Sequence, residues 1–146
     1  MSSSVSKNAQ VVLVEDNPDD VILVREALHS RGLQVDLSVI ETDGQAEEFL
    51  SALANKDDPC PVLVLLDLNL PELHSEHFLR QLRMHPSCAY VEVVVVSSSD
   101  NPADREFARV LGTDKFFHKP TDLEDFLKLG DVVAAHLASD KSDHRK

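Results

Sequence analysis

Residues 61–71 read Pro-Val-Leu-Val-Leu-Leu-Asp-Leu-Asn-Leu-Pro. The segment 62–66 is entirely apolar and lacks the alternation of a strand that has one face in water. Such a run is typical of a central parallel strand that is buried on both faces. The run ends at Asp67, and the carboxyl ends of strands in an open parallel sheet line its ligand crevice. The stretch therefore predicts an α/β fold with a site at Asp67.

Strand-like and helix-like segments alternate on both sides of this run. We expect further strands near residues 10–14, 33–39, 90–96 and 115–118, with a helix after each strand. The segment 33–39 alternates apolar and polar residues, which indicates a half-exposed edge strand. With right-handed crossovers, these features predict a flavodoxin-like (βα)5 fold, in which a doubly wound parallel sheet of five strands has the order 2-1-3-4-5.

Capping residues mark where helices start. Asn17 and Asn101 are each followed by proline, a pair typical of a helix N-terminus. We expect the last helix to begin at a capping box that starts at Thr121 and to bury Leu123. Gly130 lies inside this helix and costs about 1 kcal/mol of helix propensity relative to alanine, so we expect the helix end to fray.

Length and composition favour a single domain. The chain has 146 residues, of which 42% are hydrophobic, and this suits one core. We expect this domain to span residues 9–138, between flexible tails at 1–8 and 139–146. No apolar stretch approaches the roughly 18 residues that cross a bilayer, and the N-terminus lacks the apolar core of a signal peptide. We therefore expect a cytoplasmic protein without membrane contact.

Charge and cysteine content narrow the function classes further. The net charge of −12 argues against direct nucleic-acid binding and suits a carrier that meets a more basic protein surface. Cys60 and Cys88 are too few and too far apart for a disulfide framework or a metal knuckle. We therefore predict that both cysteines are structural and lie in a reducing compartment.

Polar residues follow four of the expected strands: Glu15 and Asp16, then Asp67, Ser97 and Lys119. In the order 2-1-3-4-5 the switch point lies between strands one and three, so three carboxylates should meet there. Close carboxylates raise one another's pKa unless a cation is near. Lys119 can supply one positive charge and a divalent ion another, and Mg²⁺ prefers such an all-oxygen site.

A metal, an ammonium and a hydroxyl around a carboxylate also suit phosphoryl transfer. The transferred group is rich in negative charge, and catalysis there is mostly positioning and charge neutralisation. Asp67 would act as the nucleophile and form an acyl phosphate. Ser97 and Lys119 would bind the new phosphoryl oxygens.

These residues resemble the signature of a known family. Glu-Asp-Asn-Pro at 15–18, Leu-Asp-Leu-Asn-Leu-Pro at 66–71, Ser97 and the pair Lys119-Pro120 are similar to the bacterial two-component response-regulator receiver domain. The resemblance covers residues 9–138, and the spacings between the motifs also fit. In particular, the chain resembles stand-alone regulators that serve phytochrome-type histidine kinases.

The resemblance implies a phosphorelay signalling protein that catalyses only its own phosphorylation and dephosphorylation. Asp67 would accept a phosphoryl group from the phosphohistidine of a sensor histidine kinase. Asp16, Asp67 and the backbone carbonyl of Asn69 would bind Mg²⁺, or Mn²⁺ in its place, with Glu15 acting through water.

Other residues would read the phosphorylated state. Ser97 and Lys119 would contact the phosphoryl group, Phe116 would be the aromatic switch residue, and the Lys119-Pro120 peptide bond would be cis. The resulting surface change would act on a downstream protein target. The face built by helix four, strand five and helix five would bind that target or a second copy of the chain.

Simpler readings exist for each feature taken alone. Asp16 could cap a helix, Ser97 could belong to a turn, and Lys119 could be a surface residue. A phosphatase of the haloacid-dehalogenase type also uses an aspartate after a buried strand, but it places a second aspartate where this chain has Asn69. A pseudo-receiver would keep the fold and work without phosphorylation. Ser75, where a glycine is usual, and Phe116, where a tyrosine is frequent, depart from the family pattern.

Overall fold

A single parallel sheet forms the centre of the molecule. The computed structural model describes residues 9–54, 60–68, 74–98, 101–113 and 115–143. The strand order is β2-β1-β3-β4-β5, and all neighbouring strands pair in parallel. The predicted fold class and strand order are therefore confirmed. The strands are β1 (Ala9–Val14), β2 (Val35–Ile40), β3 (Leu63–Leu66), β4 (Glu92–Ser97) and β5 (Lys115–His118).

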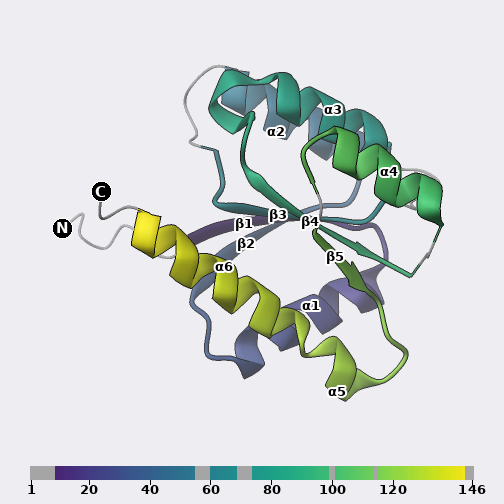
Figure 1. Cartoon of the computed structure of the whole chain (residues 1–146), viewed down its shortest axis with the longest axis vertical. Helices are drawn as coiled ribbons and strands as arrows, with labels where there is room; N and C mark the ends of the chain where they lie inside the picture. Colours follow the sequence, from purple (N-terminus) through teal and green to yellow (C-terminus); the bar gives the residue numbers. More distant parts are fainter. Residues whose placement is uncertain (1–8, 55–59, 69–73, 99–100, 114, 144–146) are drawn as a thin grey trace.

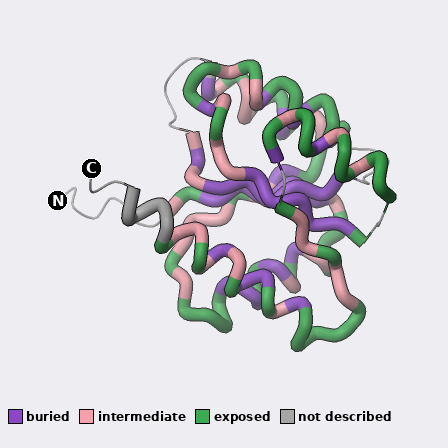
Figure 2. Tube along the Cα trace, in the orientation of Figure 1, coloured by how far each residue is buried: buried purple, intermediate pink, exposed green. Residues whose placement is uncertain are grey.

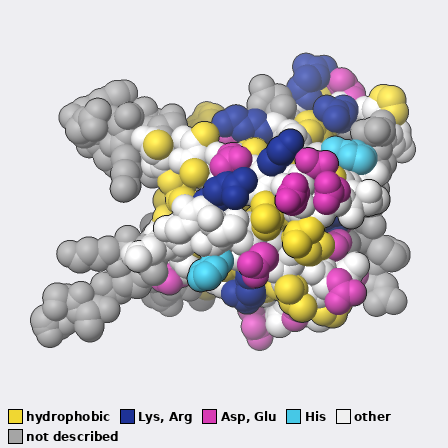
Figure 3. Space-filling model, turned by 90° about the horizontal axis from the view of Figure 1, so that it is seen from below, with side chains coloured by type: hydrophobic (Ala, Val, Ile, Leu, Met, Phe, Trp, Pro, Cys, Tyr) yellow, Lys and Arg dark blue, Asp and Glu magenta, His cyan; other side chains and the backbone are white. Residues whose placement is uncertain are grey.

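Helices cover both faces of the sheet. In Figure 1, α2, α3 and α4 lie on one face, and α1, α5 and α6 lie on the other. On the face that Figure 3 shows, acidic and basic side chains are interspersed with apolar ones. The helices are α1 (Pro18–Ser30), α2 (Asp43–Ala54), α3 (Ser75–Met84), α4 (Pro102–Val110), α5 (Leu123–Phe126) and α6 (Leu129–Asp143), with a 3-10 turn, η2 (Pro86–Cys88), between α3 and β4.

The strand that decides the fold is completely buried. All residues of β3 have an exposed fraction of 0%, and Figure 2 shows the buried core running through the sheet. Val64 and Leu66 join the apolar cluster under α2 and α3, whereas Leu63 and Leu65 join the cluster under α1 and α6. Successive side chains of a strand point to opposite faces. Full burial of one such side chain contributes about 2 kcal/mol, so the double coverage explains the unbroken apolar run.

The edge strand and two helix starts agree with the sequence. β2 lies at an edge of the sheet, and its residues other than Ile40 are partly or fully exposed. The side chain of Asn17 accepts a hydrogen bond from the backbone N–H of Asp19 at 2.9 Å and caps α1. The side chain of Asn101 accepts one from the N–H of Ala103 at 3.0 Å and caps α4. Both predicted caps are thus confirmed.

The C-terminal helix differs from its prediction. Asp122, and not Thr121, caps α5, because its side chain accepts a hydrogen bond from the N–H of Glu124. The helix is also divided into α5 and α6, and Leu123 is 51% exposed. α6 continues to Asp143, past the expected domain end at residue 138. A short α5 turns its first residues toward solvent, which is why Leu123 is not part of the core.

Gly130 has a packing role that the sequence did not reveal. It lies at the start of α6, where α6 passes α1. A Cβ atom at this position would overlap the carbonyl oxygen of Ala27 and come within 2.6 Å of the Arg31 side chain. Arg31 in turn pairs with Asp131 through an Nε–Oδ1 contact of 2.6 Å. The missing side chain therefore allows the two helices to approach closely.

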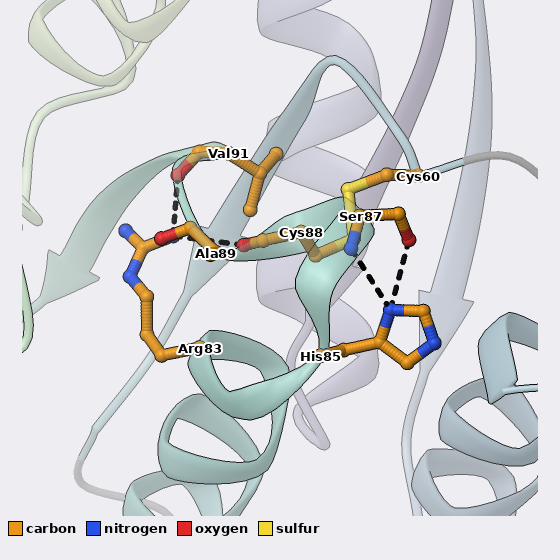
Figure 4. Close-up of a disulfide and its surroundings, with 7 residues drawn as sticks. All are labelled: Cys60, Arg83, His85, Ser87, Cys88, Ala89 and Val91. Atoms are coloured by element: carbon orange, nitrogen blue, oxygen red, sulfur yellow. Dashed lines mark hydrogen bonds between the residues drawn. A yellow bond between two sulfur atoms is a disulfide. The ribbon is translucent and has the colours of Figure 1, made fainter.

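The expectation that Cys60 and Cys88 are too far apart for a disulfide was wrong. Cys60 and Cys88 form a disulfide with a Cα–Cα distance of 5.6 Å (Figure 4). The two residues are 28 positions apart in sequence, but they precede β3 and β4, which are neighbouring strands. Parallel pairing therefore brings their chain segments together.

Candidate functional site

Lys119 is the centre of the site predicted at the carboxyl edge of the sheet. Its Nζ atom donates hydrogen bonds to Glu15 Oε1 at 2.7 Å, Asp20 Oδ2 at 2.7 Å and Asp67 Oδ2 at 2.8 Å. Three donors are all that a lysine ammonium offers. The side chain of Lys119 is only 10% exposed. The ammonium thus joins three carboxylates in a nearly closed space.

The backbone of the sheet brings these residues together. The N–H of Asp67 donates to the carbonyl of Val14 at 3.2 Å, so Asp67 continues the pairing of β3 with β1 and lies beside the next residue, Glu15. The N–H of Lys119 donates to the carbonyl of Ser97 at 2.9 Å, which extends the pairing of β5 with β4. Parallel strands end at the same edge, and the polar residues that follow them share that edge.

Burial sets the electrostatics of the site. Glu15 is 1% exposed and Asp67 is 6% exposed. Burial raises the pKa of Glu15 above its usual value, and the hydrogen bond from Lys119 opposes this effect only in part. Burial alone would lower the pKa of Lys119, but hydrogen bonds to Asp20, Asp67 and Glu15 outweigh it and raise this pKa above its ordinary value. Lys119 is therefore firmly protonated at neutral pH.

Asp20 is a member of the site that sequence reasoning missed. It lies in the first turn of α1, where acidic residues usually interact with the helix dipole. Its side chain is 21% exposed, more than those of the other carboxylates bound to Lys119. The signal was present, because α1 begins directly after the acidic end of β1, so its first turn must lie at the same edge of the sheet.

The other residues predicted for the metal and phosphoryl site are Ser97, Asp16 and Asn69. Ser97 is 6% exposed and ends β4 beside Lys119. Asp16 is half-buried next to Glu15. Asn69 lies outside the described residues. Within the described ranges, no group of three or more His, Cys, Asp or Glu side chains is arranged to hold a metal ion. The magnesium ligand set stays a prediction.

Phe116 faces the helices and not the carboxylate cluster. It packs against the apolar cluster under α2, α3 and α4, and the guanidinium of Arg105 lies 4.6 Å from the centre of its ring. Phe107 packs against the same cluster beneath Arg80, at 5.0 Å. Both rings are thus partly buried and stacked on a cation, an arrangement that stabilises an aromatic side chain. The switch role of Phe116 stays a prediction.

The sequence also singled out the Lys119-Pro120 peptide bond and Ser75. The expected cis peptide at Lys119-Pro120 is wrong, because no peptide bond among the described residues is cis. The trans form is the favoured one even before proline, by about 0.5–1 kcal/mol. Ser75, at the start of α3, is 2% exposed, and its hydroxyl oxygen has no hydrogen-bond partner among the described residues.

None of the helices in the described parts of the chain is both long and apolar enough to cross a bilayer.

Known proteins are similar to the chain in sequence. Response regulator Rcp1 of Synechocystis sp. (strain ATCC 27184 / PCC 6803 / Kazusa) is 29% identical over 130 residues, which are 88% of this chain and 88% of the relative. Protein PilH of Pseudomonas aeruginosa is 28% identical over 127 residues, which are 87% of this chain and 98% of PilH.

Solved structures share the fold. The phosphorylated cyanobacterial phytochrome response regulator RcpA matches with a TM-score of 0.74 and 27% identity, over 86% of this chain and 91% of that one. The Mn²⁺-bound form of Rcp1 matches with a TM-score of 0.73 and 28% identity, over the same shares. These relatives include regulators of phytochrome signalling.

The family model described as "Response regulator receiver domain" matches residues 11–130. Members of this family act in two-component signal transduction. The chain therefore belongs to the response-regulator receiver domain family.

Proposed function

We propose that Asp67 accepts a phosphoryl group from the phosphohistidine of a sensor histidine kinase, in a reaction that depends on Mg²⁺. The observation that carries this proposal is the buried Asp67 carboxylate, held 2.8 Å from the Lys119 ammonium at the carboxyl edge of the sheet. Family membership supports it, as does the likeness to a regulator that was solved in its phosphorylated form.

The chemistry is nucleophilic displacement at phosphorus. A carboxylate oxygen of Asp67 attacks the phosphorus atom, the bond from phosphorus to the histidine nitrogen breaks, and an acyl phosphate forms. Lys119 donates a hydrogen bond to a phosphoryl oxygen and must give up one carboxylate partner to do so, because its three donors are all in use. The Ser97 hydroxyl at the end of β4 supplies a second donor.

The chemistry and charge of the donors, rather than their present arrangement, favour a hard divalent cation. Glu15, Asp20 and Asp67 offer carboxylate oxygens around a single ammonium, which leaves negative charge to neutralise when all three are ionised. Asp16, Asp67 and the carbonyl of Asn69 would hold Mg²⁺, with Glu15 binding through water. Mn²⁺ would be a substitute, which agrees with the likeness to a Mn²⁺-bound form of Rcp1. When bound, the metal neutralises the charge of the phosphoryl oxygens.

The likeness to phytochrome regulators points to a phytochrome-type kinase as the upstream partner. Phosphorylation would draw Ser97 toward the site and let Phe116 repack, so that the surface of α4, β5 and α5 changes. This surface would bind a downstream protein or a second copy of the chain. The protein would work in the cytoplasm, without membrane contact and without binding nucleic acid directly.

A labelling experiment tests the central claim. The protein is incubated with acetyl phosphate, with and without Mg²⁺, and its intact mass is measured. We expect one phosphoryl group per chain with Mg²⁺, almost none without it, and none in Asp67→Asn. Asp19→Asn is the matched control, because Asp19 is an exposed carboxylate near the same edge. Labelling of Asp67→Asn at the wild-type level would refute the proposal.

A further inference from the structure

The Cys60–Cys88 disulfide encloses the segment that carries Asp67. Cys60 lies shortly before β3, and Cys88 ends η2 shortly before β4. The chain between them contains β3, Asp67 and α3, so the bond ties together the two ends of the proposed phosphoacceptor segment. Asp67 follows β3 at its other end, roughly 23 Å along an extended strand from Cys60. The disulfide is thus separate from the carboxylate site.

The two cysteines differ in how accessible they are. Cys88 is 0% exposed and belongs to the core under α2 and α3, whereas Cys60 is only partly buried at the edge of that core. A thiol or disulfide reagent from solution therefore meets Cys60 first. Cys88 is placed to react only with a sulfur already held inside the fold.

The turn of Cys88 is anchored independently of the disulfide. Arg83 donates hydrogen bonds to the carbonyls of Cys88 at 3.3 Å, Ala89 at 3.4 Å and Val91 at 2.7 Å, as Figure 4 shows. The N–H of Cys88 also donates to the carbonyl of His85 at 2.9 Å. Arg83 reaches a second segment as well, because its Nε donates to the carbonyl of Leu111 at 2.7 Å.

On the other side, Cys60 packs against the apolar core two residues before Val62, whose N–H donates to the carbonyl of Gln10 at 3.0 Å, and β3 pairs with β4 from Leu63 onward. The turn of Cys88 and the chain that follows Cys60 are therefore anchored by contacts that do not need the bond. Two thiols held in this way stay within reach of each other after reduction. The bond can open and close while the sheet and η2 remain folded.

Persistent disulfides are rare where thiols are kept reduced, and those found there are usually transient and redox-sensing. We propose that Cys60 and Cys88 form a reversible thiol–disulfide pair, in which Cys60 is the attacking thiol and Cys88 the resolving one. The proposal rests on the proposed function in one respect, namely that a partner of histidine kinases works in a reducing compartment.

The oxidant is a low-molecular-weight disulfide. The Cys60 thiolate attacks one of its sulfurs, the disulfide bond of the reagent breaks, and one thiolate leaves and takes up a proton. The Cys88 thiol loses its proton and attacks the Cys60 sulfur of the mixed disulfide, which expels the second reagent thiol. Two electrons and two protons pass from the protein to the reagent. Reduction follows the same steps in reverse, beginning at the more exposed Cys60.

Glutathione buffers test the proposal on the full chain. Reduced protein and oxidised protein are each equilibrated at ratios between fully reduced and fully oxidised glutathione. The samples are quenched with acid and alkylated, and the intact mass of the protein is measured. We expect two alkylated thiols at the reduced end, none at the oxidised end, and the same curve from both directions, with an unchanged far-ultraviolet circular dichroism spectrum. Two free thiols at every ratio would overturn the proposal, as would a disulfide that survives excess reduced glutathione.

Single variants test the assigned roles. In Cys88→Ser we expect the mixed disulfide with glutathione to accumulate on Cys60. In Cys60→Ser we expect the buried Cys88 to react with oxidised glutathione at least tenfold more slowly than Cys60 reacts in Cys88→Ser. Equal rates in the two variants would refute the proposed order of attack. Where a variant fails to fold, the rates of the two thiols in the reduced wild type, resolved by peptide mapping after brief alkylation, give the same comparison. Acetyl phosphate labelling of the same samples measures the phosphorylation of Asp67 independently of the thiols. Failure of the redox proposal can therefore be distinguished from failure of the phosphorylation proposal.

Discussion

The Nζ atom of Lys119 lies 2.7 Å from Oδ2 of Asp20, so a residue from the first turn of α1 shares the ammonium with the carboxylates that end β1 and β3. Asp20 is the most exposed of these partners. It is therefore the carboxylate that Lys119 can release with the smallest loss of buried charge pairing when a phosphoryl oxygen arrives.

This arrangement predicts that Asp20→Ala speeds the labelling of Asp67 by acetyl phosphate. One such hydrogen bond contributes about 1 kcal/mol, which corresponds to roughly a fivefold change in rate at 25 °C. The measurement is the initial rate of labelling by intact mass at saturating Mg²⁺. Asp19→Ala, in the same helical turn, should leave the rate unchanged. Slower labelling in Asp20→Ala would show that Asp20 positions Lys119 productively and does not compete for it.

Removing the ammonium should be costly for stability. In Lys119→Met the buried Glu15 and Asp67 lose their common counter-charge, and we expect the free energy of unfolding to fall by about 3 kcal/mol at pH 7. Urea unfolding followed by circular dichroism measures this change. Lys128→Met breaks an exposed contact with Asp125 and should cost about 0.5 kcal/mol or less. Equal losses in the two variants would contradict a buried charge cluster.

A contact between α2 and α3 predicts a pH dependence. The backbone N–H and the Nδ1 of His74 lie 3.0 Å and 2.6 Å from the two Asp43 oxygens, and these hydrogen bonds lower the pKa of Asp43 below its usual value. A carboxyl with a lowered pKa in the folded state stabilises the fold above its unfolded pKa, and this stability is lost as the pH falls through the folded pKa.

Asp43→Asn should therefore lower the melting temperature at pH 6, and the gap to the wild type should narrow as the pH falls below the unfolded pKa of aspartate, about 3.9. Thermal melts between pH 3 and pH 7 measure the gap. Asp125→Asn, whose side chain is exposed in α5, is the control and should give a smaller gap at every pH. A gap that widens toward acid would mean that the contact does not act through the ionised carboxylate.

The close passage of α1 and α6 predicts opposite effects for two glycine variants. Gly130→Ala should destabilise the protein by about 2 kcal/mol, because overlap with the Ala27 carbonyl outweighs the gain in helix propensity. In Gly44→Ala, near the start of α2, the new Cβ would lie an ordinary 3.8 Å from the Thr42 hydroxyl, so the change should be neutral or stabilising by up to about 1 kcal/mol. Denaturant unfolding compares the two. A neutral Gly130→Ala would mean that the helices separate at little cost.

The amino-acid sequence alone determined the architecture and most of the site. The apolar run before Asp67 indicated a doubly covered strand, and alternation in 33–39 indicated the edge strand, because local periodicity records which faces are buried. The polar residues after four strands predicted where Glu15, Asp67 and Lys119 would meet, since parallel strands share one carboxyl edge.

Tertiary structure alone decided the remaining features. Asp20 joins Lys119, Cys60 joins Cys88, and Gly130 meets Ala27, each across a long stretch of sequence. Such pairs depend on how helices cross and on which loops end beside each other. The local periodicity of apolar residues does not encode these contacts, because they form only when the helices and strands pack around one core.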